Sequence, residues 1–182
     1  MTRRFAWGFA WAALAAVGLT GCGGGSGGGT GPLGTGGWDG TKACDTLKQA
    51  DVEAITEQKS KPGRLDGVHP AGDGGAAVSV CYYELADGRT VSLLTRVSSG
   101  EELAAAVNAI KNPPPDMAMG KLDDVPGVGK AALWNDSTKQ FHVWLDGDHY
   151  GIITTSRGDY TKQPDLSEAR EQSIELARKI GG

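Results

Sequence analysis

Glycine makes up 11 of the 18 residues from Gly23 to Gly40. Glycine loses more conformational freedom on folding than any other residue and has no side chain to bury, so a tract of this density does not form part of a packed core. We therefore expect residues 22–40 to form a flexible tether and the folded part of the chain to begin near Thr41. Residues 41–182 then provide the length of one ordinary domain.

The segment before the tract predicts export from the cytoplasm. Arg3 and Arg4 give it a positive start, and the run from Phe5 to Leu19 consists of 15 apolar or small residues. As a helix this run would be about 22 Å long, which is shorter than the roughly 30 Å hydrocarbon core of a bilayer. Residues 1–21 are therefore predicted to be a signal peptide and not a membrane span.

The cysteine after the signal resembles the lipidated cysteine of bacterial lipoproteins. The stretch Leu19, Thr20, Gly21, Cys22 is similar to the lipobox, in which the cysteine sulfur receives a diacylglycerol and the signal is cut just before it. The resemblance implies that Cys22 anchors the chain to the extracytoplasmic side of the cell membrane, because two acyl chains bind a bilayer stably. The alternatives are an ordinary secretory signal with an incidental cysteine, or an engineered linker in place of a natural tether.

The charge of the chain argues against two kinds of partner, nucleic acids and anionic lipid surfaces. Without Arg3 and Arg4, which lie in the predicted signal, 16 basic side chains face 22 acidic ones, a formal charge of −6. Nucleic acids and anionic lipid surfaces both require a basic face. We therefore expect no nucleic-acid partner, and we expect the membrane to be contacted through the lipid anchor alone.

Two further cysteines, Cys44 and Cys81, remain for the exported domain. An even pair in an oxidising compartment predicts a disulfide, which here would close a loop of about 37 residues and remove chain entropy equivalent to about 4 kcal/mol. A redox pair is disfavoured because there is no C-x-x-C spacing. A zinc site is disfavoured because no histidine lies at metal-finger spacing from either cysteine.

Hydrophobic patterning predicts an α+β domain. Helical spacing of apolar residues indicates helices within residues 45–57, 99–112 and 165–180, and β-rich runs indicate strands at 76–85, 90–97, 131–134, 141–145 and 149–155. The order is helix, two strands, helix, three strands, helix, which favours an antiparallel sheet of about five strands with helices packed on one face. The segment from Lys59 to Ala76 is rich in Pro, Gly and Asp and is predicted to be a long loop.

Three side chains near the last hairpin form a candidate binding face. A tight turn at Asp146 and Gly147 would place His149 opposite Trp144, with His142 two residues along on the same face. If the alternate residues of these strands fill the core, the three side chains lie on the other face and leave a large aromatic exposed, as in many recognition surfaces. The alternative is a Trp144 covered by the long loops or by the segment around Met117.

The motifs that would indicate catalysis or metal binding do not occur in the sequence. The histidines at 142 and 149 lack an evident third metal ligand, although Asp146 and Asp148 are near, so no metal and no cofactor are predicted. The VPGVGK stretch lacks phosphate-loop spacing and is predicted to be a turn, and there is no G-x-S-x-G. No catalytic residue is predicted. Paired carboxylates such as Asp123 and Asp124 are predicted to be solvated surface.

Several short motifs together resemble a family of uncharacterised actinobacterial lipoproteins that is defined only as a domain of unknown function. They are the lipobox, the low-complexity tether, Cys44, Leu47, Asp51 with Val52, Cys81 with Tyr82, Val125 to Gly129, Ala132 with Trp134, and Leu176 to Ile180. The resemblance covers most of the chain and implies an extracytoplasmic domain with a Cys44–Cys81 disulfide. It implies no activity.

These observations lead to a prediction of function by class. We expect a noncatalytic binding or accessory module that is held at the membrane and engages an envelope protein or a small ligand. The alternative is a small cell-envelope hydrolase or metal-dependent enzyme. The sequence does not indicate an oligomeric state.

Overall fold

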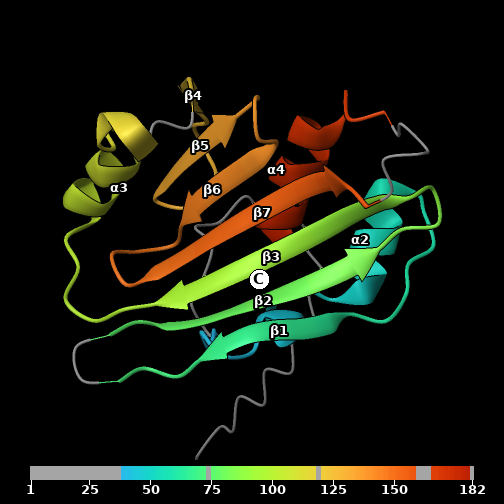
Figure 1. Cartoon of the computed structure of the whole chain (residues 1–182), viewed down its shortest axis with the longest axis horizontal. Helices are drawn as coiled ribbons and strands as arrows, with labels where there is room; N and C mark the ends of the chain where they lie inside the picture. The colour runs from blue at the N-terminus through green and yellow to red at the C-terminus, as the bar shows by residue number, and fades with distance from the viewer. Residues whose placement is uncertain (1–37, 73–74, 118–119, 159–164, 181–182) are drawn as a thin grey trace, which may run out of the picture. The chain divides into compact units, whose positions relative to one another are not determined.

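The computed structural model describes residues 38–72, 75–117, 120–158 and 165–180 (Figure 1). The described elements, in chain order, are α1 (Ala43–Thr46), α2 (Gln49–Thr56), β1 (Arg64–His69), β2 (Ala77–Glu84), β3 (Arg89–Val97), α3 (Leu103–Lys111), the 3-10 turn η1 (Pro115–Met117), β4 (Leu122–Asp124), β5 (Ala131–Asn135), β6 (Gln140–Trp144), β7 (His149–Arg157) and α4 (Ala169–Lys179). The lipidation candidate Cys22, the predicted signal at 1–21 and most of the predicted tether lie outside the described residues.

The strands form one open antiparallel sheet in the order β1-β2-β3-β7-β6-β5-β4. The α+β class and the antiparallel pairing are as predicted, but the sheet has seven strands and not about five. The five predicted strands are present as β2, β3, β5, β6 and β7. The additional strands are the two edges: β1 lies inside the segment predicted to be a loop, and β4 is only three residues long.

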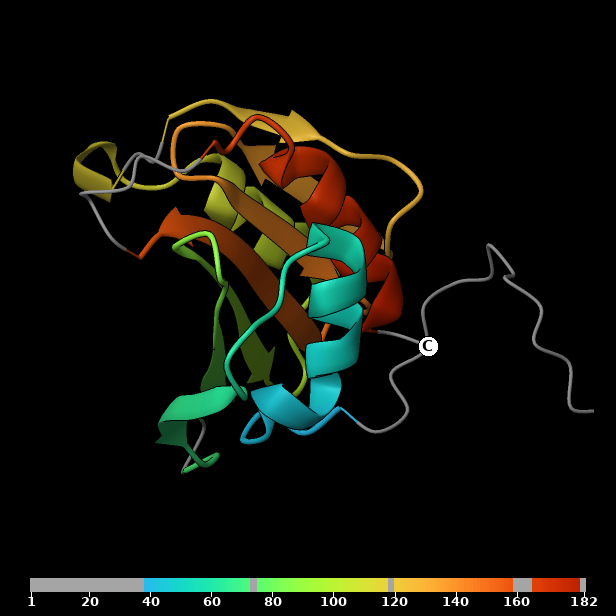
Figure 2. The same cartoon turned by 90° about the vertical axis from the view of Figure 1, so that its right-hand side faces the viewer.

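One face of the sheet carries the main hydrophobic core. We call it the helical face, because α1 packs on β2 and β3 while α4 packs on β6 and β7 (Figure 2). The side chains that point to this side alternate along each strand, as the period of two requires. They include Cys81, Tyr83, Val91, Leu93, Phe141, Val143 and Ile153, which are all buried with Leu176 and Ala177 of α4.

The remaining helix, α3, packs on the opposite face, which we call the second face. Its apolar side chains Leu103, Ala106, Val107 and Ile110 recur at helical spacing and form a separate cluster with Leu133, Trp144 and Tyr150 of the sheet. The prediction that all helices pack on one face is therefore wrong. Because β5 and β6 are covered on both sides, Phe141 to Trp144 are buried without interruption and do not alternate between buried and exposed.

The predicted disulfide between Cys44 and Cys81 is present, with the two Cα atoms 5.0 Å apart. It fastens α1 to the middle of β2, where Cys81 is fully buried. Two hydrogen bonds reinforce the same contact: the Ala43 amide donates to Ser79 Oγ at 3.0 Å, and the Tyr83 hydroxyl donates to the Leu47 carbonyl. The sheet and the first helices therefore form one cross-linked unit.

The packed domain includes residues that the sequence assigned to the tether. Trp38 Nε1 donates to the Ile180 carbonyl at 2.6 Å, and the Gly40 carbonyl accepts from Thr95 Oγ1 at 3.0 Å. The packed region therefore includes Trp38 and Gly40, upstream of the predicted start at Thr41. The high glycine content of the tract predicted a tether, but Gly40 belongs to the packed domain. It is buried, and a Cβ at this position would lie 2.5 Å from the Ala77 carbonyl oxygen, so only glycine fits there.

The VPGVGK stretch is a turn between β4 and β5, as the sequence predicts. Its two glycines both have positive φ, +79° at Gly127 and +61° at Gly129. The turn is fixed by the Val125 amide donating to the Ala132 carbonyl at 2.9 Å and by the Lys130 amide donating to the Trp144 carbonyl at 2.7 Å. The motif is thus explained by backbone conformation without any ligand.

The two glycines differ in the space around them, which gives a matched pair of variants. A Cβ at Gly129 would lie 2.4 Å from the Trp144 carbonyl oxygen, whereas a Cβ at Gly127 has no atom within 4 Å. We expect Gly129→Ala to lower the free energy of unfolding by about 2 to 4 kcal/mol, and Gly127→Ala by only the roughly 1 to 2 kcal/mol of left-handed strain. Urea unfolding of both variants measures the difference, and equal losses would contradict this view of the turn.

Candidate functional site

The first two residues of the predicted binding face, His142 and Trp144, are core residues. Both lie on β6 and point to the second face, where each is 1% exposed. The Trp144 ring packs against the Tyr150 ring at 4.7 Å, and both belong to the cluster beneath α3. The alternative of a covered tryptophan therefore applies, and the covering element is the apolar face of α3.

The third residue, His149, lies on the helical face. The observed register pairs Trp144 with Tyr150, so the turn is one residue longer than a tight turn and His149 points to the other side. The Asp146 carboxylate stabilises this longer turn by accepting from the amides of Asp148 and His149, each at 2.8 Å. The His149 ring lies edge-on to Trp38, with the ring centres 6.1 Å apart. The three predicted residues therefore share no surface.

His142 is the most unusual titratable group of the second face. Its Nδ1 lies 2.5 Å from the Tyr150 hydroxyl oxygen, and its Nε2 is buried without a hydrogen-bond partner among the described residues. Burial lowers the pKa of His142 to about 4, because the apolar surroundings disfavour the charged ring. The same burial raises the pKa of the Tyr150 hydroxyl. At neutral pH both groups are uncharged, which suits a packed aromatic cluster.

The lowered pKa of His142 predicts that acid destabilises the domain. The unfolded chain binds the proton near the ordinary pKa of 6.5 and the folded chain only near 4, so stability is complete above pH 6.5 and is lost as the pH falls toward 4. The expected loss between pH 7.5 and pH 5 is about 2 kcal/mol. Denaturant unfolding at the two pH values measures it, and His142→Gln should remove most of that difference. An unchanged difference in the variant would contradict the assignment.

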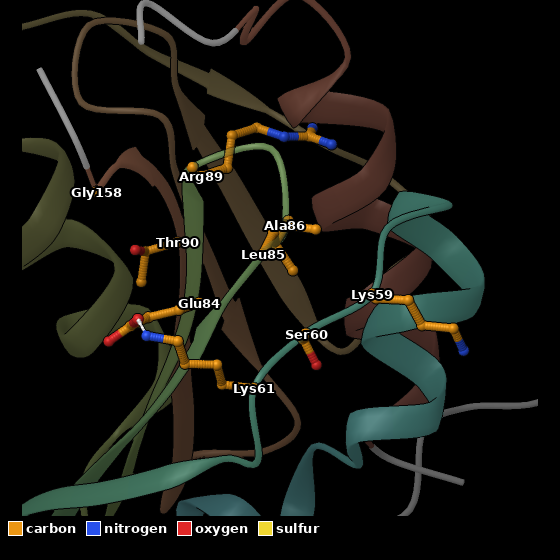
Figure 3. A pocket seen from close by; sticks show the side chains of 10 residues that line it. Lys59, Ser60, Lys61, Glu84, Leu85, Ala86, Arg89, Thr90 and Gly158 are labelled. Atoms are coloured by element: carbon orange, nitrogen blue, oxygen red, sulfur yellow. Dashed lines mark hydrogen bonds and ion pairs between the residues drawn. The ribbon is translucent and has the colours of Figure 1, made fainter. Parts of the chain in front are cut away.

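A hollow of about 610 Å³ lies at the β2–β3 turn (Figure 3). It is lined by Lys59, Ser60, Lys61, Glu84, Leu85, Ala86, Gly88, Arg89, Thr90 and Gly158. Three cations border it, and each is already paired. Lys59 binds Glu53, Lys61 binds Glu84, and Arg89 binds Asp87.

The pairing of these cations limits what the hollow can bind. Arg89 is the only buried one of the three, and its guanidinium also donates to Gln172 Oε1 at 3.0 Å, so it points to α4 (Figure 3). The two lysine–carboxylate pairs are exposed and would contribute little to holding an anion. We therefore do not place the functional site in this hollow.

The second face is covered by α3 only near β5 and β6, and the rest of it forms what we call the open face (Figure 1). The open face consists of side chains that are half-buried and point to the same side of neighbouring strands: Val78, Val80, Tyr82, Thr90, Ser92, Leu94, Arg96, Ile152 and Thr154. The helices of the main core, α1, α2 and α4, lie on the other side of the sheet (Figure 2). Of the open-face side chains Ile152, at the border with α3, packs against the cluster beneath that helix, and no described helix covers Val80, Tyr82 or Leu94.

The open face contains a continuous apolar row. Val80 is paired with Leu94, and Leu94 with Ile152, so their side chains adjoin across three strands. The next pair along β2 and β3 adds Tyr82, whose ring carries the Arg64 guanidinium 5.0 Å from its centre. The sequence shows that the side chains of β2 alternate between two faces. It does not show which of the two faces is covered by helices.

The chain matches no known protein family, curated sequence or solved structure. Within the part of the chain that the structure describes, no three metal-ligating side chains come together, and no helix is long and apolar enough to cross a membrane. The resemblance to the actinobacterial lipoprotein family therefore continues to depend on the short motifs themselves.

Proposed function

We propose that the protein is a lipid-anchored, extracytoplasmic binding module that engages another exported protein of the cell envelope through the open face, without catalysing a reaction. The observation that supports this most is the half-buried apolar row Val80, Leu94 and Ile152, bordered by Tyr82. A patch of apolar and aromatic side chains with a polar border is the usual composition of a protein interface.

The rigidity of the open face favours a preorganised docking surface. Its strands are central in the sheet, and their reverse sides pack into the main core and are fastened by the Cys44–Cys81 disulfide. A partner that packs on these strands would bury apolar area without first ordering a loop, and so would avoid part of the entropic cost of binding. The anchor predicted at Cys22 would keep the domain near other envelope proteins.

Site-specific photocrosslinking in intact cells tests the proposal. A benzophenone side chain is placed at Leu94 or, separately, at Tyr82 on the open face, and at the exposed helix positions Ala105 of α3 and Glu175 of α4, away from the open face, as controls. We expect one discrete adduct with an exported protein from the two open-face positions and none from the controls. Val80→Asp in the same chain should abolish the adduct, since it places a charge in the apolar row.

Two results would contradict the proposal. One is the same set of adducts from the control positions as from Leu94 and Tyr82. The other is an adduct from Leu94 that persists with Val80→Asp while the domain stays folded by circular dichroism. Either result would mean that the open face is ordinary surface.

A further inference from the structure

The edge strand β1 is the most exposed regular element of the described chain. All six of its residues are exposed, and within the described residues it pairs with β2 alone, so its outer backbone groups face solvent (Figure 1). It carries two of the three exposed large hydrophobic side chains found in the described part, Leu65 at 43% and Val68 at 45%. An edge of this kind is a template for pairing with another strand.

The charges of β1 are arranged symmetrically about Leu65. Arg64 and Asp66 flank it and point to the same side of the sheet, where they form an ion pair of 2.6 Å within the strand. In an antiparallel pair of two identical strands centred on Leu65, Arg64 of each copy lies opposite Asp66 of the other. Both cross-strand charge contacts are then favourable, and the two Leu65 side chains meet on the other side of the sheet.

We propose that a second copy of this chain pairs with β1 about a two-fold axis at Leu65, which joins the two sheets into one. Residues 64–66 are complementary in charge to the same residues of a second, antiparallel copy, and such self-complementarity is what a two-fold interface requires. The pairing uses the edge of the sheet and not the open face, so it holds or fails independently of the proposed function.

The fold also explains why such pairing would stop at two copies. The two-fold contact uses the β1 edges of both chains, and the opposite edge, β4, has only three residues. On β1 itself the pairing with β2 becomes irregular between Asp66 and His69, where Gly67 has a φ of +56°. This irregularity limits the regular stretch to the residues around Leu65, so the interface is short. Membrane anchoring would raise the local concentration of copies.

Cysteine trapping distinguishes the proposed register from random contact. In the exported full chain, Leu65→Cys would place two thiols directly opposite each other, within the roughly 4.5 to 5.5 Å Cα separation of paired residues that a disulfide can bridge. Val68→Cys is a control of equal exposure on the same strand. Because Leu65 is paired with Cys81 of the structural disulfide, peptide mass spectrometry identifies the linkage, and only a bond between the two introduced thiols counts as the proposed dimer. In the proposed register, the two Val68 residues are six residues apart along the strands, or about 20 Å.

We expect Leu65→Cys to form a covalent dimer under mild oxidation at least tenfold faster than Val68→Cys, with the unmodified chain as the baseline. Equal rates for the two variants, no dimer from Leu65→Cys, or trapping of a different protein by Leu65→Cys would overturn the proposal.

Charge reversal gives a second, independent readout. Arg64→Asp or Asp66→Arg alone places like charges opposite each other in both cross-strand contacts, and should weaken dimerisation by about tenfold in sedimentation of the detergent-solubilised protein. The double variant with both changes restores opposite charges and should restore the dimer. A double variant as weak as either single variant would overturn the two-fold arrangement, as would single variants that leave the dimer unchanged.

Discussion

Replacing Trp144 with alanine is expected to lower the free energy of unfolding by about 3 to 5 kcal/mol. The side chain is 1% exposed, stacks on Tyr150 and belongs to the apolar cluster on which α3 packs. Its removal leaves a cavity between α3 and the sheet, which a single short helix can only partly fill by moving. Chemical denaturation followed by far-ultraviolet circular dichroism measures the loss without relying on tryptophan fluorescence.

A suitable control for this variant is Met117→Ala, because Met117 is 65% exposed and should change stability by less than about 0.5 kcal/mol. A Trp144→Ala protein with nearly unchanged stability would mean that the tryptophan is free to anchor a partner. That outcome would favour a binding site on the β6–β7 hairpin, as the sequence analysis proposed.

Removing the disulfide is expected to cost about 4 kcal/mol of stability. Cys44 and Cys81 are separated by 37 residues, and opening that loop restores conformational entropy to the unfolded chain. For a domain of this size the loss corresponds to a fall in the melting temperature of about 10 to 15 °C. Thermal unfolding of a protein with both Cys44→Ala and Cys81→Ala measures this, and reduction of the unmodified protein should give a similar shift.

The double replacement is preferable to a single one, because a lone thiol could form mixed disulfides. If the doubly substituted protein and the parent had the same midpoint in guanidinium chloride, the cross-link would contribute nothing to stability. The contact of α1 with β2 would then depend on the Ala43–Ser79 and Tyr83–Leu47 hydrogen bonds and on packing.

Local signals in the sequence were sufficient for much of the fold. The β2–β3 hairpin was predicted from two β-rich runs around Asp87 and Gly88, and the structure has its turn there, with Gly88 at a φ of +88°. The disulfide was predicted from the two cysteines that remain once Cys22 is set aside. The edge strand β1 was missed because its pairing with β2 comes from backbone hydrogen bonds, while its exposed residues lack the alternation that marks a half-buried strand.

The candidate site could not be predicted in the same way. In a strand, a shift of one residue in a turn reverses the face of every side chain that follows. The turn at Asp146 is one residue longer than the tight turn predicted, so His149 lies on the opposite side from Trp144. Which face of the sheet α3 covers depends on contacts between segments that are far apart in the sequence, and local patterns do not predict such contacts. The open face could therefore be identified only from the structure.

The proposal that the protein is an anchored envelope module depends on the processing of Cys22, which lies outside the described residues. Intact-mass and peptide mass spectrometry of the mature protein, extracted from membranes with detergent, can determine this modification. We predict a chain that begins at Cys22 and carries a diacylglyceryl group on its sulfur, with Cys44 and Cys81 oxidised. A chain recovered from the soluble cytosol with residues 1–21 retained, Cys22 unmodified and both remaining thiols reduced would contradict it.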